Sequence, residues 1–261
     1  MNTTDASGGM GFPLPPPASR LLPPIRFLHG WGLHGAIWAE TMAAISGDAP
    51  DLPGYGAAGT VTPYTAESLA DALAEGIDVP RCVVGWSMGG MVALALAARH
   101  PGKVQRLVLV GASPSFVIRP GWGHGLEPGV VEGFARSLAD DYRGTLQRFL
   151  TLQARGDEAA RAVVTRLRES VLDGREPAPA TLADGMSLLR EVDLRDTATA
   201  VRCPTLVVHG AYDALCPVAA GRWLAAFIPG ARLAEHARAG HAPFLSHPAW
   251  FAATLRDFLH G

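Results

Sequence analysis

The sequence predicts an α/β fold, in which a mostly parallel β-sheet is flanked by helices and carries a helical insertion. Short apolar, β-branched runs alternate with Ala- and Leu-rich helical stretches, an order typical of parallel sheets. Gly or Pro bounds each of these runs, as is common for buried strands. In contrast, residues 115–195 show helical periodicity throughout and no convincing strand.

The elements follow from local composition in chain order. Strands are expected at residues 25–29, 81–86, 107–110 and 205–209. Helices are expected at residues 88–99 and 218–228, which are rich in the residues that favour helices.

These elements divide the chain into three parts. Residues 1–24 are rich in Gly, Ser and Pro and are expected to form an extended lead-in. Residues 25–114 and 196–261 form the α/β core, and residues 115–195 form a helical cap inserted between two strands. Because the carboxyl ends of parallel strands border the ligand crevice, an insertion at such an end is expected to shape a binding pocket.

Composition excludes several classes of protein. The 261 residues include 22 basic and 24 acidic side chains, and a net charge of −2 argues against nucleic acid or a membrane surface as partner. The three cysteines, Cys82, Cys203 and Cys216, contain no CxxC pair, which excludes a cysteine-ligated zinc site and fits a reducing compartment. No run is long enough for a membrane span and no secretory signal is evident, so a cytoplasmic protein is expected.

The nucleophile candidate is Ser87 in Gly85-Trp86-Ser87-Met88-Gly89. This G-x-S-x-G pattern follows an expected strand and opens an expected helix, the setting in which a serine sits on a sharp turn as a nucleophile. Its glycines are needed because neighbouring side chains would collide at such a turn. The alternative is a Gly-rich turn whose serine only caps the helix.

A serine nucleophile needs a base and an acid that orients the base. His241 is the candidate base, in a short loop after the apolar run near residues 231–237. Asp213 is the candidate acid because it lies just beyond the carboxyl end of an expected strand; the order Ser, Asp, His is that of α/β-hydrolases. Asp193 and Asp196 are rival acids, and a turn-forming role is the alternative for Asp213.

An oxyanion hole requires two backbone N–H donors. One is expected from Met88, directly after the nucleophile, and the other from Trp31 in the loop after the first strand. Gly30 and Gly32 allow that loop to turn its N–H groups toward the pocket, where the indole would form a wall. The alternative is that Trp31 is only a core residue.

Four segments together resemble the α/β-hydrolase superfamily, at residues 27–33, 51–56, 85–90 and 240–244. The tryptophans in HGWGL and GWSMGG, the stretch RFLTLQ at 148–153 and the stretch APFLSHP at 242–248 resemble one group more closely. That group is the pimeloyl-acyl-carrier-protein methyl ester esterases of biotin synthesis. Two departures affect one side of the sheet: the Pro-rich start replaces a β-hairpin, and residues 38–51 are short.

The resemblance implies a carboxylesterase with Ser87 as nucleophile, Asp213 as acid and His241 as base, while Trp31 and Met88 bind the ester oxygen. It implies that the acyl channel is lined by Phe149, Leu150, Thr151, Leu152 and Gln153. It also implies that an acidic acyl carrier protein is held by Arg143, Arg148, Arg161 and Arg166. We expect a monomer that needs no metal and no organic cofactor.

Three other functions stay open. An esterase or lactonase for a free small molecule would use the same three residues without a carrier. A C–C bond hydrolase would use them on a ketone. A non-catalytic ligand receptor on the same fold would not need Ser87, Asp213 and His241 together, so the intact set weighs against it.

Overall fold

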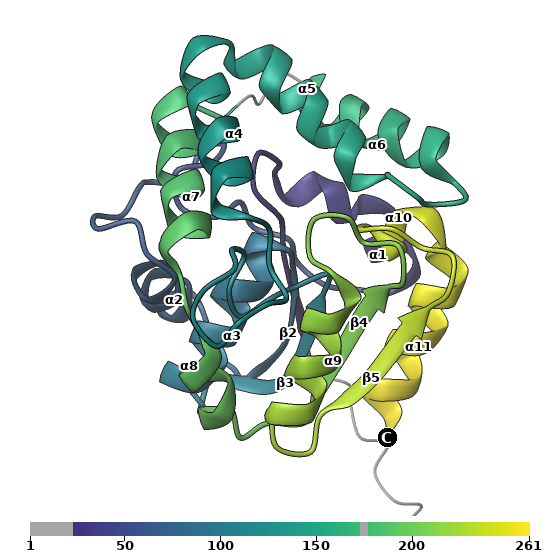
Figure 1. The fold of residues 1–261 in the computed structure, drawn as a ribbon. Coiled ribbons are helices and arrows are strands. Elements are labelled where there is room, and N and C mark those ends of the chain that lie inside the picture. Colours follow the sequence, from purple (N-terminus) through teal and green to yellow (C-terminus); the bar gives the residue numbers. More distant parts are fainter. Residues whose placement is uncertain (1–22, 173–176) are drawn as a thin grey trace, which may run out of the picture.

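The computed structural model describes residues 23–172 and 177–261, and the predicted lead-in at 1–24 lies almost wholly outside them. A five-stranded sheet has the order β1-β2-β3-β4-β5, and every neighbouring pair is parallel. The strands are β1 (Ile25–Leu28), β2 (Arg81–Trp86), β3 (Val104–Val110), β4 (Thr205–Gly210) and β5 (Arg232–His236). The predicted parallel α/β fold is therefore confirmed (Figure 1).

Two strands differ from the sequence prediction for the same physical reason. β3 begins at Val104 rather than at residue 107. Its first residues include the polar Gln105 and Arg106, so the apolar run in the sequence starts later than the strand. β5 at the edge of the sheet was not predicted as a strand, since its side chains are exposed or half-buried and include Arg232 and Glu235. A search for buried apolar runs misses polar edge strands of this kind.

Helices cover both faces of the sheet (Figure 1). On one face a layer is formed by α2 (Ala66–Glu75), α3 (Met88–Arg99), α8 (Arg195–Ala200) and α9 (Val218–Phe227). On the opposite face α1 (Ala39–Ala44) contacts α11 (Pro248–His260), next to the short η1 (Gly35–Trp38) and α10 (Pro243–Ser246). The helices predicted at 88–99 and 218–228 are α3 and α9.

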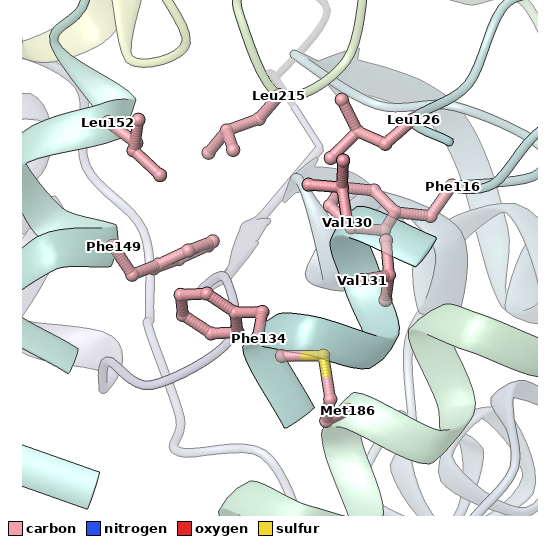
Figure 2. A pocket seen from close by; sticks show the side chains of 9 residues that line it. All are labelled: Phe116, Leu126, Val130, Val131, Phe134, Phe149, Leu152, Met186 and Leu215. Carbon is pink, nitrogen blue, oxygen red and sulfur yellow. The ribbon is translucent and has the colours of Figure 1, made fainter. Parts of the chain in front are cut away.

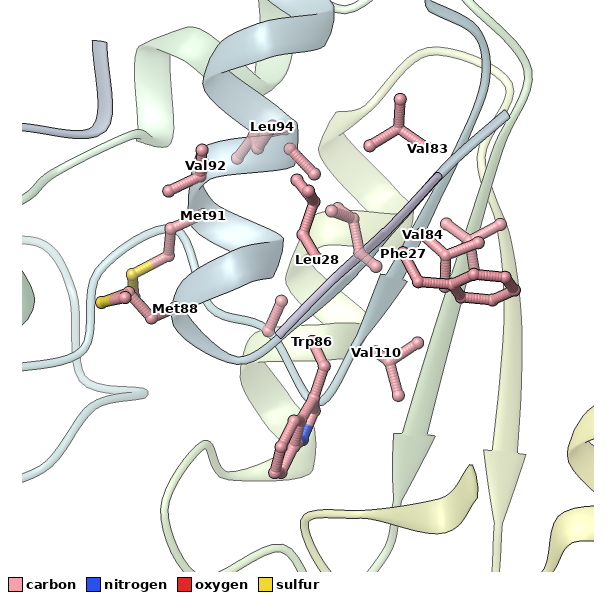
Figure 3. Packing of buried hydrophobic residues seen from close by; sticks show 14 of the residues in the cluster. Phe27, Leu28, Val83, Val84, Trp86, Met88, Met91, Val92, Leu94 and Val110 are labelled. Carbon is pink, nitrogen blue, oxygen red and sulfur yellow. The ribbon is translucent and has the colours of Figure 1, made fainter. Parts of the chain in front are cut away.

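The core is centred on α3, which contacts β1, β2 and β3. Every residue from Met88 to Ala97 is buried, because the sheet lies on one side of the helix and α2 and α8 lie on the other. A helix that is apolar all round is stable only in such a setting. Figure 3 shows Leu28 and Val83 on the side of the strands that α3 covers, and Met91 and Val92 on the side of the helix that faces away from the strands.

Between β3 and β4 the described residues form five helices, of which α8 belongs to the layer that covers the sheet. The other four are α4 (Pro128–Asp140), α5 (Tyr142–Gln153), α6 (Ala160–Leu172) and α7 (Pro179–Glu191). In Figure 1 they lie together on one side of the sheet. The chain enters them after the carboxyl end of β3, so they lie at the edge of the sheet where parallel strands end. Within the described residues no helix is long and apolar enough to cross a membrane.

The edge beside β1 is short, in keeping with the short segment noted at 38–51. Residues 45–50 contribute a single bridge, from Asp48 to Arg26. The Asp48 carboxylate also accepts hydrogen bonds from Arg26 at 2.9 Å and from Arg81 at 3.3 Å. These two guanidinium groups fasten the segment to β1 and β2.

The close approach of α3 to β1 generates a stability prediction. A Cβ atom on Gly89 would lie 2.4 Å from the carbonyl oxygen of His29, whereas one on Gly102 would have no neighbour within 4 Å. We therefore expect Gly89→Ala to lower the free energy of unfolding by about 1–3 kcal/mol through overpacking. Urea unfolding measures the change, and Gly102→Ala is the matched control; equal stability of the two variants would contradict the close approach.

Candidate active site

Ser87 occupies the sharp turn predicted between strand and helix. β2 ends at Trp86 and α3 begins at Met88, which leaves one residue for the change of direction. Ser87 has φ 56° and ψ −121°, and it alone among the described non-glycine residues has a positive φ. Such backbone is held only when its surroundings determine it, and here the Ser87 N–H donates to the carbonyl of Val110 at 3.0 Å. The strained conformation marks Ser87 as a candidate functional residue.

Glycines make this turn possible. A Cβ atom on Gly85 would lie 2.3 Å from the carbonyl oxygen of Gly89, so the strand and helix touch through their backbones. A Cβ on Gly30 would lie 3.3 Å from Cβ of Ser87, which brings the loop after β1 beside the nucleophile candidate. Side chains at either position would push these segments apart.

The structure brings Asp213 and His241 together across 28 residues of sequence. His241 Nδ1 lies 2.7 Å from Asp213 Oδ2, and both side chains are buried. Asp213 follows the end of β4 and His241 follows the end of β5, so two adjacent parallel strands deliver them to one edge. The rival Asp193 instead pairs with Arg195 at 2.7 Å, and the rival Asp196 lies in the first turn of α8.

The Asp213 carboxylate is ionised despite its burial. Its Oδ1 accepts hydrogen bonds from the N–H groups of Leu215 at 2.9 Å and Cys216 at 2.8 Å. Burial by itself raises the pKa of Asp213, but the neighbouring His241 and His209 side chains outweigh burial and hold this pKa well below its usual range. A negative charge is therefore present beside His241 at neutral pH.

The loop that carries His241 is held from three directions. The His241 N–H donates to the carbonyl of Gln153 at 3.1 Å, and the His241 carbonyl accepts from the Trp86 indole N–H at 2.9 Å. The N–H of Gly240 donates to the Asp157 carboxylate at 2.7 Å. These bonds hold His241 beside the residue that precedes Ser87, since the centroids of the His241 and Trp86 rings lie 5.6 Å apart with the rings tilted by 47°.

The second ring nitrogen of His241 is available for proton transfer. Nε2 is buried and has no hydrogen-bond partner among the described residues. Among the described residues, His241 Nε2 therefore makes no hydrogen bond to Ser87 Oγ. Catalytic hydrogen bonds of this kind commonly tighten only when substrate binds. With Nδ1 bonded to Asp213, the arrangement suits a base that takes a proton at Nε2.

The two expected oxyanion donors lie on backbone that flanks Ser87. Met88 is the first residue of α3, and the N–H groups of a helix's first turn have no partner within the helix. Trp31 lies in the loop after β1, and its side chain is buried, with the indole N–H donating to the carbonyl of Leu182 at 2.9 Å. The indole packs edge-on against Phe149 and Phe134, so Trp31 is part of the core and supports two of the side chains that line the adjoining pocket.

His29 organises the loop after β1. Its Nε2 accepts from the N–H of Leu52 at 2.9 Å, and its Nδ1 lies 2.9 Å from the carbonyl oxygen of Gly30. Burial lowers the pKa of His29 to about 4. The ring is therefore neutral at physiological pH and serves to join the Trp31 loop to the segment that follows Asp51.

An apolar pocket lies beside Trp31 and is shown in Figure 2. It encloses about 340 Å³ of space not filled by atoms, part of which is open to solvent. All nine lining residues are hydrophobic: Phe116, Leu126, Val130, Val131, Phe134, Phe149, Leu152, Met186 and Leu215. Such a pocket suits a hydrocarbon chain, because it offers apolar contacts and no polar partner.

Only part of the implied acyl channel lines this pocket. Of the five residues at 149–153, Phe149 and Leu152 do so. Leu150 is buried in the core, Thr151 is exposed with its hydroxyl bonded to the carbonyl of Gln147, and the buried Gln153 binds His241 through its carbonyl. Consecutive residues of a helix point about 100° apart, so five in a row cannot face one pocket. The remaining walls come from α4, α7 and residues 116–126, which sequence patterns did not single out.

The four implied carrier-binding arginines differ in their surroundings. Arg161 is exposed and makes no ion pair with any residue in the described ranges. Arg148 lies 2.7 Å from the Thr145 hydroxyl and 3.9 Å from the Asp141 carboxylate, and its side chain is 60% exposed. Arg143 bonds to the Tyr142 hydroxyl. Arg166 is tied to Glu40 at 2.9 Å and to the carbonyl of Leu245, so it fastens α6 to the core.

In the described part of the chain, no group of three or more His, Cys, Asp or Glu side chains is placed to hold a metal ion.

Comparisons with known proteins identify the fold and the family of this chain. The profile of the alpha/beta hydrolase fold family matches residues 23–248. A curated pimeloyl-[acyl-carrier protein] methyl ester esterase of Aromatoleum aromaticum is 43% identical over 248 residues, which cover 92% of this chain and 99% of the relative. One of Chromobacterium violaceum is 41% identical over 242 residues, covering 91% and 94%. A solved esterase from Exiguobacterium antarcticum superposes with a TM-score of 0.83 at 25% identity, covering 92% of each chain.

The chain belongs to the α/β-hydrolase family, the class that its sheet and its Ser87 turn define. Within that family it belongs with the pimeloyl-[acyl-carrier protein] methyl ester esterases, because the curated relatives match it over most of both chains.

The strained turn generates a prediction that separates catalysis from stability. Ser87→Ala and Ser87→Gly should both lower kcat/KM by about 10⁴–10⁶-fold, because each removes the nucleophile. Glycine adopts positive φ freely, so Ser87→Gly should be about 1 kcal/mol more stable than Ser87→Ala. Ester hydrolysis and urea unfolding measure the two effects. A serine-directed phosphonate should add one label, on Ser87, and labelling of another serine would contradict the assignment.

Proposed function

We propose that the protein is a serine carboxylesterase that hydrolyses the methyl ester of pimeloyl-acyl-carrier protein in biotin synthesis. The observation that carries the reaction type is the Asp213–His241 pair at 2.7 Å, on the same sheet edge as the strained Ser87. The names of the curated relatives support the substrate. The apolar pocket beside Trp31 supports an acyl chain as the group to be bound.

Acylation uses the three side chains in sequence. His241 Nε2 takes the proton of the Ser87 hydroxyl while Ser87 Oγ forms a bond to the ester carbonyl carbon. Asp213 holds the Nδ1 proton of His241 and stabilises the imidazolium that forms. The carbonyl oxygen becomes an oxyanion, which the N–H groups of Trp31 and Met88 would bind; one such donor is worth about 3 kcal/mol.

The intermediate then collapses. The bond to the methoxy oxygen breaks, and His241 returns its proton to that oxygen, so methanol leaves and an acyl-Ser87 ester remains. Water attacks this ester with His241 again as base, and the second tetrahedral intermediate releases the free carboxylate and Ser87. Atoms and protons balance without a further reactant: one ester and one water give one acid and one methanol.

Carrier binding is assigned to the exposed arginines of α5 and α6. Arginine binds phosphate and carboxylate bidentately, which suits the phosphopantetheine arm and an acidic carrier helix. Arg161 is the strongest candidate because it is exposed and makes no ion pair with any described residue. Arg166 is the weakest, since Glu40 and Leu245 already occupy its guanidinium group.

A second candidate function is an esterase or lactonase for a free small molecule. Its support is that Arg143 and Arg148 have local partners in Tyr142, Thr145 and Asp141. A solved enol-lactonase from Burkholderia xenovorans LB400 also superposes with a TM-score of 0.76 at 25% identity, covering 93% of this chain and 94% of that one. The two candidates share their catalytic residues and differ only in whether a carrier is recognised.

The choice of acid gives a sharp test. Asp213→Asn keeps the shape of the side chain but removes the charge and favours the wrong tautomer of His241, so turnover should fall about 10⁴-fold. Asp193→Asn is the matched control, because its carboxylate pairs with Arg195, and it should retain wild-type turnover. Hydrolysis of a nitrophenyl ester measures both. An active Asp213→Asn together with an inactive Asp193→Asn would show that the acid is misassigned.

The carrier assignment is tested by comparing two substrates. Replacing both Arg148 and Arg161 by Ala should raise KM for the carrier-bound ester by about 10-fold or more, and leave KM for a small free ester unchanged. Added salt should act on the wild type in the same way, because exposed charges are screened. Arg202→Ala, an exposed arginine in the loop after α8, is the control. An equal response of both substrates would favour the free small-molecule esterase.

A further inference from the structure

A second buried histidine lies against the carboxylate of the Asp213–His241 pair. His209, near the end of β4, is 0% exposed, and its Nε2 lies 3.3 Å from Asp213 Oδ2. This is the oxygen that His241 Nδ1 approaches at 2.7 Å. One carboxylate oxygen is therefore shared by two imidazole rings, of which the proposed mechanism uses one.

The contacts of His209 fix its tautomer. Nε2 lies 2.7 Å from the carbonyl oxygen of Cys216, and a carbonyl oxygen can only accept, so Nε2 carries a proton. Nδ1 is buried and has no hydrogen-bond partner among the described residues, so a proton there would be left unpaired. His209 thus carries a proton on Nε2, which lies 2.7 Å from the Cys216 carbonyl oxygen and 3.3 Å from Asp213 Oδ2.

Helix α9 holds the ring in this position. A Cβ atom on Gly221 would lie 2.4 Å from His209 Nδ1, so the helix backbone closes directly on the far edge of the imidazole. A larger residue at 221 would displace the ring from Asp213. The contact explains why Nδ1 lacks a partner: it faces the Cα of a glycine instead of a polar group or water.

We infer that His209 is a positioning residue for the proposed triad: its Nε2–H holds Asp213 Oδ2 and limits how strongly this carboxylate stabilises the imidazolium form of His241. The inference rests on the proposed function, since it takes Asp213 as the acid. The Asp213 carboxylate then has three hydrogen-bond donors, the N–H groups of Leu215 and Cys216 on Oδ1 and the His241 ring on Oδ2, and the His209 Nε2 lies 3.3 Å from Oδ2 as a fourth polar neighbour.

The electrostatic surroundings make this effect measurable. The ionisable groups facing Asp213 are His241, His209 and the Cys216 thiol. Burial, together with the Asp213 charge, raises the pKa of Cys216, so the thiol stays uncharged. Gly111, directly after β3, also lies near Asp213 Oδ2, and as a glycine it contributes only backbone atoms there. Loss of the His209 donor would concentrate the carboxylate charge on His241.

The test is the pH profile of kcat/KM for a nitrophenyl ester. His209→Leu removes the donor, so His241 should stay protonated to higher pH. The low-pH side of the profile (the acid limb) should therefore move up by about 0.5–1 pH unit, and kcat should fall about 10-fold. His209→Gln keeps an amide N–H near the place of Nε2 and should return the acid limb toward its wild-type position. If His209 served only in packing, the position of the acid limb would not depend on whether residue 209 can donate a hydrogen bond.

Several results would overturn the inference. The inference is wrong if the acid limb of His209→Leu lies at the same pH as that of the wild type. It is also wrong if His209→Gln displaces the acid limb as far as His209→Leu does. The triad assignment is judged separately by Asp213→Asn, which must be nearly inactive if Asp213 is the acid. If His209→Leu does not fold, assigned histidine ring resonances of the wild-type protein decide by NMR at neutral pH. A proton on Nε2 of His209 supports the inference, and a proton on Nδ1 contradicts it.

Discussion

The active-site edge depends on one close backbone crossing, where the first turn of α3 passes the ends of β1 and β2 without a side chain between them. Gly89 lies against the carbonyl oxygens of Leu28 and His29, and Gly85 lies against the carbonyl of Gly89. The crossing forces Ser87 into its strained conformation and sets the Trp31 loop beside the start of the helix. Displacing α3 outward would separate the nucleophile and the Met88 N–H from the Trp31 loop that carries the other proposed oxyanion donor.

A buried charge imposes the second constraint. A carboxylate removed from water is costly unless hydrogen bonds and opposite charge replace its hydration. Asp213 obtains them from a tight turn, whose N–H groups at Leu215 and Cys216 point back to it, and from two imidazoles. The turn after β4 is thus shaped by the need to solvate one side chain, which in turn fixes the orientation of His241.

Much of the fold and site could be predicted because the signals are local. Buried strands such as β2 and β4 are continuous apolar runs, and Asp213 could be predicted because it lies just beyond the end of one of them. His241 could be paired with Asp213 through the order Ser, Asp, His. The edge strand β5 could not be predicted as a strand, because charged residues interrupt its apolar ones and none of its side chains is fully buried. Pocket walls such as Phe116 and Met186 escaped because they depend on how distant helices pack. His209 could be predicted only as the end of a strand, since its contact with Asp213 depends on a turn.

The helices α4 to α7, which lie between β3 and α8 in the chain, are attached unevenly to the rest of the molecule. The turn between α5 and α6 is bonded to the His241 loop through Gln153 and Asp157, and α7 is bonded through Leu182 to the Trp31 indole. Among the described residues, none of the hydrogen bonds or ion pairs joins α4 to the sheet or its loops, although Val130, Val131 and Phe134 of α4 line the pocket. Moving α5, α6 or α7 would therefore disturb the catalytic geometry, whereas a shift of α4 would break apolar contacts alone and would change the shape of the pocket without moving Ser87, Asp213 or His241.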